Sequence, residues 1–109
     1  MLRIYVAGPY TLGDVEQNVK NAIIAGDHII NNGGAPFIPH LTHYHEQMFH
    51  HEWIEWVDVD NAFLLVCDAL LRLPGDSKGA DMEVMEAFQS KIPVFYNENA
   101  LFNWMKEMT

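Results

Sequence analysis

The sequence predicts one α/β domain, residues 1–109, built from a parallel sheet of four to five strands with helices on both faces. Short apolar segments alternate with longer amphipathic segments in the order βαβαβαβα, which is typical of a parallel sheet with right-handed crossovers. The first apolar segment is apolar on both faces except at Arg3, as a central strand of such a sheet requires. A chain of 109 residues also has no room for a second hydrophobic core.

The first third of the chain is expected to form a strand, a helix and a second strand. Leu2–Ala7 is the first strand, and the turn Gly8-Pro9 ends it. Asp14 caps a helix that runs to about Asn31, and the apolar residues of this helix recur at helical spacing. A run of asparagines and glycines stops the helix, and the short strand Ala35–Ile38 follows.

The rest of the chain has one segment without periodicity and then regular elements. Pro39–His51 holds five histidines and is expected to be a loop. The expected elements after it are a helix from near His50 to about Val66, a strand at Ala69–Leu73, a helix at Gly79–Gln89, a strand at Ile92–Tyr96 and a short helix at Asn99–Met108. The whole order corresponds to a three-layer, flavodoxin/Rossmann-like fold.

Composition limits the expected partners and compartment. The formal net charge of −9 argues against nucleic-acid polymers and anionic membrane surfaces, because both would repel the chain. The single cysteine, Cys67, cannot form an internal disulfide, and no signal peptide or membrane span is visible, so a cytoplasmic protein is expected. Trp53, Trp56, Phe102 and Trp104 are either core aromatics or exposed apolar bulk that would support a homodimer or higher homo-oligomer.

The stretch Leu73–Ala87 is the first candidate for a functional site. A strand leads into it, a Pro-Gly turn breaks the strand, and Asp76 or Ser77 then caps a new helix. Ligands bind at the carboxyl ends of parallel strands, and a helix start suits an anion such as phosphate because its N–H groups are free. Glu83 lies one turn into this helix, where a carboxylate is pre-positioned as a nucleophile or general acid/base.

Each candidate residue also has a plain structural interpretation. Glu83 fits an exposed acid favoured by the helix dipole, and its position alone makes this the commoner case. Asp60 fits a solvated helix face, Tyr5 fits a core tyrosine whose hydroxyl has a partner, and Ser77 fits a helix cap. Taken singly, none of these residues predicts catalysis.

Three histidines, His40, His43 and His45, have an H-x-x-H-x-H spacing that raises a metal-binding hypothesis. A zinc site needs three or four rigidly held ligands, whereas these lie in an expected loop beside Pro39 and have no cysteine partners. A binding loop, with a histidine or Tyr44 against a ligand, is the favoured interpretation, and no metal or other cofactor is expected. The histidine cluster also predicts that the protein is sensitive to pH at about pH 6.

Four segments together resemble a known enzyme family. They are Ile4-Tyr5-Val6-Ala7-Gly8-Pro9-Tyr10-Thr11, Asp60, Cys67-Asp68-Ala69-Leu70-Leu71 and Ser77-Lys78-Gly79-Ala80-Asp81-Met82-Glu83. Over nearly the whole chain they resemble the nucleoside 2-deoxyribosyltransferase superfamily, and most closely a branch of small bacterial and phage proteins related to the 2′-deoxynucleoside 5′-monophosphate N-glycosidases. The most specific part is S-x-G-x-x-x-E after an apolar strand, together with a first-strand tyrosine two residues before alanine-glycine.

The resemblance implies roles for residues of three segments. Glu83 matches the glutamate that attacks the anomeric carbon, and Tyr5 matches the tyrosine that positions that glutamate. Asp60 matches the aspartate that binds the sugar hydroxyls or assists protonation of the leaving base. Ser77 and Gly79 match the segment that binds the 5′ end of the sugar.

Further residues would contact the substrate in the same pocket. The resemblance places Gly8 there, and the loop Gly8-Pro9-Tyr10-Thr11 is more similar to the aromatic loop of the transferases than to that of the monophosphate hydrolases, which carries an arginine. His40 and His43 are the substrate-contact candidates of the histidine-rich segment. The family generally works as dimers or larger assemblies, in which a neighbouring chain helps to close each site.

The expected function is cleavage of the base–sugar bond of a nucleoside, a deoxynucleoside or its 5′-monophosphate, with Glu83 as nucleophile. Water would complete a hydrolase reaction, and a second base would complete a deoxyribosyltransferase reaction; the short chain favours the hydrolase. A non-catalytic nucleotide-binding module is the alternative from another class, and a metal-binding protein is a more distant one.

Overall fold

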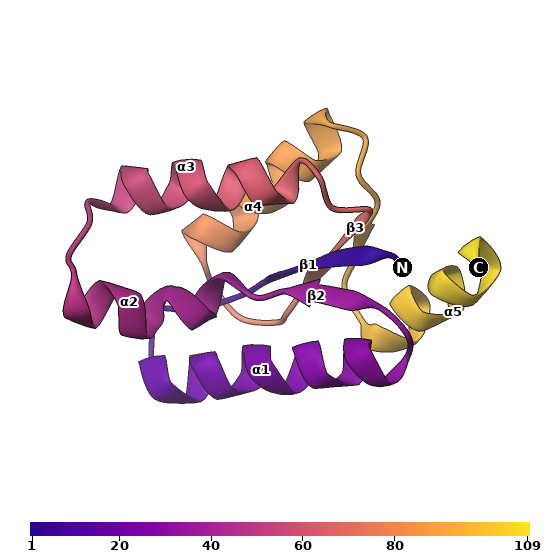
Figure 1. Ribbon diagram of the computed structural model, residues 1–109, viewed down its shortest axis with the longest axis horizontal. Helices are drawn as coiled ribbons and strands as arrows, with labels where there is room; N and C mark the ends of the chain where they lie inside the picture. The colour runs from indigo at the N-terminus through magenta and orange to yellow at the C-terminus, as the bar shows by residue number, and fades with distance from the viewer.

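The computed structural model describes residues 1–109 and forms a four-stranded parallel sheet with helices on both faces, which confirms the predicted fold class (Figure 1). The elements are, in chain order, β1 (Arg3–Ala7), α1 (Val15–Asn31), β2 (Ala35–Phe37), the 3₁₀ helix η1 (Pro39–Leu41), α2 (Thr42–Met48), α3 (Trp53–Leu64), β3 (Ala69–Arg72), α4 (Lys78–Gln89), β4 (Val94–Phe95) and α5 (Glu98–Met108). The strand order is β2-β1-β3-β4. No helix combines the length and the apolar character needed to cross a membrane.

β1 is one of the two inner strands of the sheet. It pairs with β2 on one edge and with β3 on the other, so that Tyr5 lies opposite both Phe37 and Leu70. Asp68, directly before β3, binds Arg3 at the start of β1. Its carboxylate accepts the Arg3 backbone N–H at 2.7 Å, and its own backbone N–H donates to the Arg3 carbonyl at 2.8 Å. The strand is buried on both faces after Arg3, which explains why its sequence is apolar without alternation.

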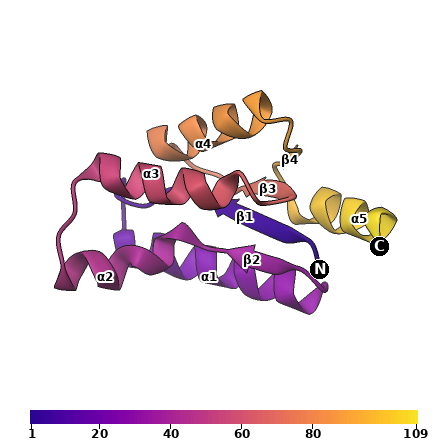
Figure 2. The same cartoon turned by 45° about the horizontal axis from the view of Figure 1, so that its top comes forward.

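Alternate side chains of β1 enter two separate cores. Ile4 and Val6 pack with α1 and α5 on one face, whereas Tyr5 and Ala7 pack with the end of α3 and with α4 on the other face. Two views show α1 on one side of the sheet and α3 with α4 on the opposite side (Figures 1 and 2). The period of two along the strand therefore directs Tyr5 toward α4.

The prediction of a loop over Pro39–His51 is wrong for most of that segment, which forms η1 and α2. The Thr42 hydroxyl donates to the Pro39 carbonyl at 2.8 Å where these two short helices join. α2 has only seven residues, too few to display a helical period in the sequence. Its position depends on contacts with α3, which a reading of local sequence does not reveal.

Two other predicted elements have different bounds. α3 begins at Trp53 rather than near His50, because Glu52 and Glu55 form a capping box there, and it ends two residues before the predicted Val66. β4 contains only Val94–Phe95, since it is an edge strand that pairs with β3 alone. The remaining ends agree with the prediction or differ from it by a single residue.

Some of the four large aromatic residues considered above are core residues and others are exposed. Phe102 and Trp104 pack against the core formed by α1, α5 and the sheet, and the Trp104 ring lies 5.3 Å from that of Phe95. Trp56 is half-buried, whereas Trp53 is 60% exposed. Only Trp53 among the four is therefore largely exposed in the single chain.

The carboxyl ends of β1, β2 and β3 open at one edge of the sheet. Gly8 follows β1, and a Cβ atom at this position would lie only 2.9 Å from the Leu73 Cβ that follows β3. Glycine is therefore needed where the two chain segments leave the sheet side by side. In parallel sheets this edge is where ligands bind.

Leu70→Ala should lower the free energy of unfolding by about 2–5 kcal/mol, because it leaves a cavity in the core shared by β1, β3 and α4. Urea unfolding followed by circular dichroism measures the loss. Leu65→Ala is the matched control: its side chain is 52% exposed, and a change within about 0.5 kcal/mol is expected. Equal losses in the two variants would contradict the packing described here.

Candidate functional site

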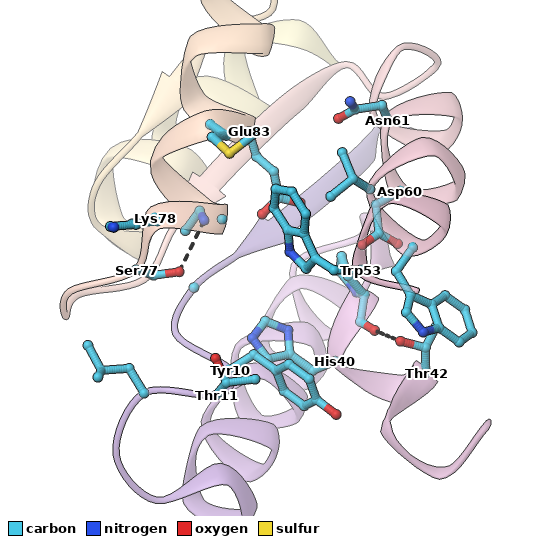
Figure 3. A pocket seen from close by; sticks show the side chains of 18 of the residues that line it. Tyr10, Thr11, His40, Thr42, Trp53, Asp60, Asn61, Ser77, Lys78 and Glu83 are labelled. Carbon is cyan, nitrogen blue, oxygen red and sulfur yellow. Dashed lines mark hydrogen bonds between the residues drawn. The ribbon is translucent and has the colours of Figure 1, made fainter. Parts of the chain in front are cut away.

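A cavity of about 640 Å³ opens at this carboxyl edge. Its walls come from the loop after β1, from η1 and α2, and from the facing sides of α3 and α4 (Figure 3). Cavities of roughly 300–1,000 Å³ hold small organic ligands in proteins, so the volume suits a small-molecule site.

Glu83 reaches into the cavity from α4. Its carboxylate accepts a hydrogen bond from the hydroxyl of Tyr5, which is fully buried in β1. Burial raises the pKa of the Glu83 carboxyl to about 8. Glu83 is therefore a shielded acid, mostly protonated near pH 7 in the free protein, and not the solvated helix residue that its position alone suggests.

Asp60 faces the same cavity from α3 (Figure 3). Its Oδ1 atom is buried without a hydrogen-bond partner, and burial raises the pKa of the carboxyl to about 6. A buried carboxylate oxygen without a partner is unfavourable unless a proton or a ligand satisfies it. Two carboxyl groups with raised pKa values thus line one cavity, a combination that is enriched at functional sites.

The start of α4 forms another part of the wall. Ser77 is the N-cap, and its Oγ accepts the Ala80 backbone N–H at 3.1 Å. Ser77, Lys78 and Gly79 all line the cavity. The first turn of α4 therefore presents a hydroxyl and backbone groups to a ligand on the same side of the cavity as Glu83.

Arg72 orders the loop that precedes this helix start. Its guanidinium donates to the carbonyl oxygens of Leu73 and Gly75, the second at 2.9 Å, and pairs with the Asp81 carboxylate at 3.0 Å. Gly75 has a φ of +112°, a backbone conformation that other residues rarely adopt. The guanidinium and the glycine together define the path of the chain into α4.

The loop after β1 and the 3₁₀ helix η1 contribute a third part of the wall. His40 is buried, and its Nε2 donates to the Pro9 carbonyl at 3.0 Å. Burial lowers the pKa of His40, and the hydrogen bonds to the Pro9 and Gly8 carbonyls oppose this effect only in part, so the ring is neutral near pH 7. The Tyr10 hydroxyl lies 2.7 Å from Nδ1 of His43, which orients the phenol.

The structure gathers the residues singled out from the sequence around this cavity. Those that line it are Gly8, Tyr10, His40, Asp60, Ser77, Gly79 and Glu83, and Tyr5 contacts Glu83 from below. Pro9 and His43 do not line the cavity. They lie one layer behind it, where their contacts with His40 and Tyr10 position those two side chains.

Several residues of the wall are not identified as site residues from the sequence, and Trp53, Trp56 and Glu46 are three of them. Trp53 and Trp56 were considered only for the core or an interface, and Glu46 fell in the expected loop. One Glu46 oxygen accepts the His51 backbone N–H at 2.7 Å and the Trp56 indole N–H at 2.9 Å, and the other lies 2.9 Å from His50 Nδ1. The i,i+4 spacing of Glu46 and His50 was the available sequence signal.

Glu46, His50, His51 and Trp56 thus form a clasp that joins α2 to α3 beside the cavity. The His51 N–H and the Trp56 indole lower the pKa of Glu46 to about 2, and Glu46 in turn raises the pKa of His50. The ring of His45 also packs edge to face against the rings of His51 and Trp56, which pack in the same way against each other. No three His, Cys, Asp or Glu side chains are grouped closely enough to hold a metal ion.

Comparison with known proteins gives one family and one fold. A family model described as "Domain of unknown function (DUF7768)" matches residues 2–97, so the chain belongs to this family. No curated protein matches the chain. A solved structure of a 2-deoxyribosyltransferase from the psychrotolerant bacterium Bacillus psychrosaccharolyticus is similar, with a TM-score of 0.63 and 21% identity over 84% of this chain and 69% of that chain. At this identity the similarity shows a deoxyribosyltransferase-like fold.

The pKa of Glu83 predicts how stability depends on pH. Because the folded value of about 8 exceeds the unfolded value of 4.5, the folded protein binds more protons, and this contribution to stability is lost as pH rises from about 4.5 to 8. Each pKa unit corresponds to about 1.4 kcal/mol. Urea unfolding between pH 5 and 8.5 should show a decline that is clearly smaller in Glu83→Gln, in which the raised pKa of Asp60 still causes a residual decline up to about pH 6. Glu16→Gln, on the exposed face of α1, is the control and should follow the wild type.

The clasp predicts a second pH effect. Since Glu46 raises the pKa of His50, the stabilising ion pair is present below the unfolded pKa of His50 and is lost as pH rises through the folded pKa. Amide exchange in α2, corrected for intrinsic rates, should therefore accelerate from pH 5.5 to 8.5. In Glu46→Gln, the amides of α2 should exchange quickly at both pH values, and the tryptophan fluorescence should change because Trp56 loses its hydrogen-bond partner. Protection of α2 in Glu46→Gln equal to that of the wild type would show that the clasp does not hold this helix.

Proposed function

We propose that this protein cleaves the N-glycosidic bond of a nucleoside, a deoxynucleoside or its 5′-monophosphate, with Glu83 as the nucleophile. The observation that carries the proposal is a glutamate shielded from solvent at the wall of a cavity, with a fully buried tyrosine donating to its carboxylate. Structural roles alone do not account for this combination, because a buried acid with a raised pKa destabilises the fold at neutral pH.

The chemistry follows from charge that develops on the sugar. As the bond between C1′ and the base nitrogen breaks, positive charge grows on the sugar ring, and a carboxylate below C1′ stabilises that charge or bonds to the carbon. A Glu83 oxygen would form the new bond to C1′ while the base leaves with the bonding electrons and takes up a proton. Water then attacks C1′, releases the sugar and restores the carboxylate.

Glu83 must be ionised to act in this way. Its raised pKa means that only a minority of free molecules hold the carboxylate near pH 7. The Tyr5 hydroxyl favours the ionised form by donating to it, and positive charge on the reacting sugar favours it further. Asp60, with its raised pKa of about 6 and an unpaired oxygen, is suited to bind a sugar hydroxyl or to hold a proton for the leaving base.

The walls of the cavity suit the remaining parts of such a substrate. Trp53, Trp56 and Tyr10 provide aromatic surface against which a base can pack. Ser77 and Gly79 at the start of α4 are placed for the 5′ end of the sugar. We assign no metal or cofactor to the reaction, since carboxylates perform the equivalent steps in glycosidases.

Three features of the wider assignment are proposals as well. We infer that residues 1–109 act as one domain, that the chain works as a homo-oligomer, and that a transferase activity arises if a second base replaces water. Exposed apolar side chains on α3 and α4 support self-association; they include Ile54, Phe63, Met85 and Phe88. A nucleotide-binding module without turnover is the alternative, and the raised pKa values of two acids in one cavity argue against it.

The proposal is tested by incubating the protein with deoxynucleosides, with and without a second base, and measuring the released base by chromatography. Glu83→Gln should lower kcat by at least about 10³-fold. Tyr5→Phe should lower it by roughly 10²-fold and move the rising limb of the pH–rate profile to higher pH, because the carboxylate loses its donor. Glu107→Gln on α5 is the matched control and should keep wild-type activity. Base release by Glu83→Gln at the wild-type rate would refute the mechanism.

A further inference from the structure

We propose that the substrate of this site carries a free 5′-hydroxyl and that 5′-monophosphates are poorly accepted. This inference rests on the proposed function and adds the class of substrate to it. Two observations carry the inference: the balance of charge around the cavity, and the engagement of the nearby arginine elsewhere in the structure.

The cavity is lined by four carboxyl groups and one side-chain cation. The carboxyl groups belong to Glu46, Asp60, Glu83 and Glu86, and the cation is Lys78. Even with Glu83 mostly protonated near pH 7, the other three acids outnumber the single cation. A phosphate monoester carries a charge of about −1.5 to −2 near neutral pH, so these acids disfavour its entry. Proteins that select phosphate place arginine or lysine donors against its oxygens. The side chains around this cavity are mainly acidic instead, so they carry the same sign of charge as a phosphate.

Arg72 is close to the start of α4 in sequence, but its guanidinium is already bound within the chain. Its donors go to two loop carbonyls and to Asp81, and its side chain is only 10% exposed. Turning it toward a ligand would leave those carbonyls without a partner and release the turn that leads to Ser77. The other arginine, Arg3, lies at the opposite end of β1. Neither arginine lines the cavity.

Lys78 is an exposed side chain and extends away from the Glu83 carboxyl (Figure 3). The other groups at this end of the cavity are the Ser77 hydroxyl and the backbone of Gly79. A 5′-hydroxyl is both a donor and an acceptor, and such neutral partners satisfy it without any compensating charge. The N–H groups at the start of α4 carry a partial positive charge of only about +0.5, which does not offset the ionised acids of the wall. The start of α4 is therefore better suited to a neutral sugar hydroxyl than to a phosphate.

The experiment compares one deoxynucleoside with its own 5′-monophosphate at pH 7.5 and low salt. We expect kcat/KM for the monophosphate to be at least tenfold lower. Added salt should narrow the difference, because charge repulsion is screened whereas a steric barrier is not. A monophosphate that reacts as fast as the nucleoside, or faster, would overturn the inference and leave the proposed function standing.

A pair of variants tests the electrostatic cause. Thr11 lies on the cavity wall and is exposed, so Thr11→Arg adds a cation and Thr11→Gln adds a neutral side chain. Thr11→Arg should raise the ratio of monophosphate to nucleoside kcat/KM at least tenfold, and Thr11→Gln should leave that ratio near the wild-type value. Equal ratios in the two variants would rule out charge as the cause.

Failure of the reaction itself is a separate outcome. If neither compound releases base, the proposed function is wrong, and calorimetry with the same two compounds then decides the inference. A nucleoside Kd at least tenfold below that of the monophosphate would support the selectivity. Equal affinities, or no binding of either compound, would overturn it.

Discussion

The hydrogen bond from the Tyr5 hydroxyl to the Glu83 carboxylate is the contact on which the candidate site depends. It joins the inner strand β1 to α4 across a core of apolar side chains. Both partners come from regular elements, so the acid is held by two rigid supports and not by a loop. The same apolar surroundings that fix its position also disfavour its charge, which places a reactive carboxyl group at the wall of a cavity with a pKa near the physiological range.

Most of the fold could be predicted from the sequence because its signals are local. β1 and β3 are apolar runs, and α1 has apolar residues at helical spacing along its length. The N-cap residues Asp14 and Ser77 mark where α1 and α4 begin. α2 could not be predicted in this way. Its seven residues are ordered by Glu46, whose partners lie in the following connection and in α3, and contacts of this kind are not visible in a local pattern.

The candidate site was predictable in position but not in environment. The resemblance to deoxyribosyltransferases pointed to Glu83, Asp60 and Tyr5. Glu83 and Asp60 do line one cavity and Tyr5 does contact Glu83, although their roles stay predictions. Sequence position alone favoured a solvated Glu83, since shielding depends on the residues that cover a side chain and not on its place in a helix. The position of Trp53 on the cavity wall could not be predicted either, because a tryptophan on a cavity wall and one in a core give the same helical pattern.

Arg72 has a consequence for how a ligand meets this protein. The turn ahead of α4 is closed by the chain's own guanidinium, so contacts within the chain order its backbone. The conformational entropy lost in shaping this entrance is therefore part of folding and not of association. A small ligand with few polar groups can then be held without first having to organise the segment that receives it.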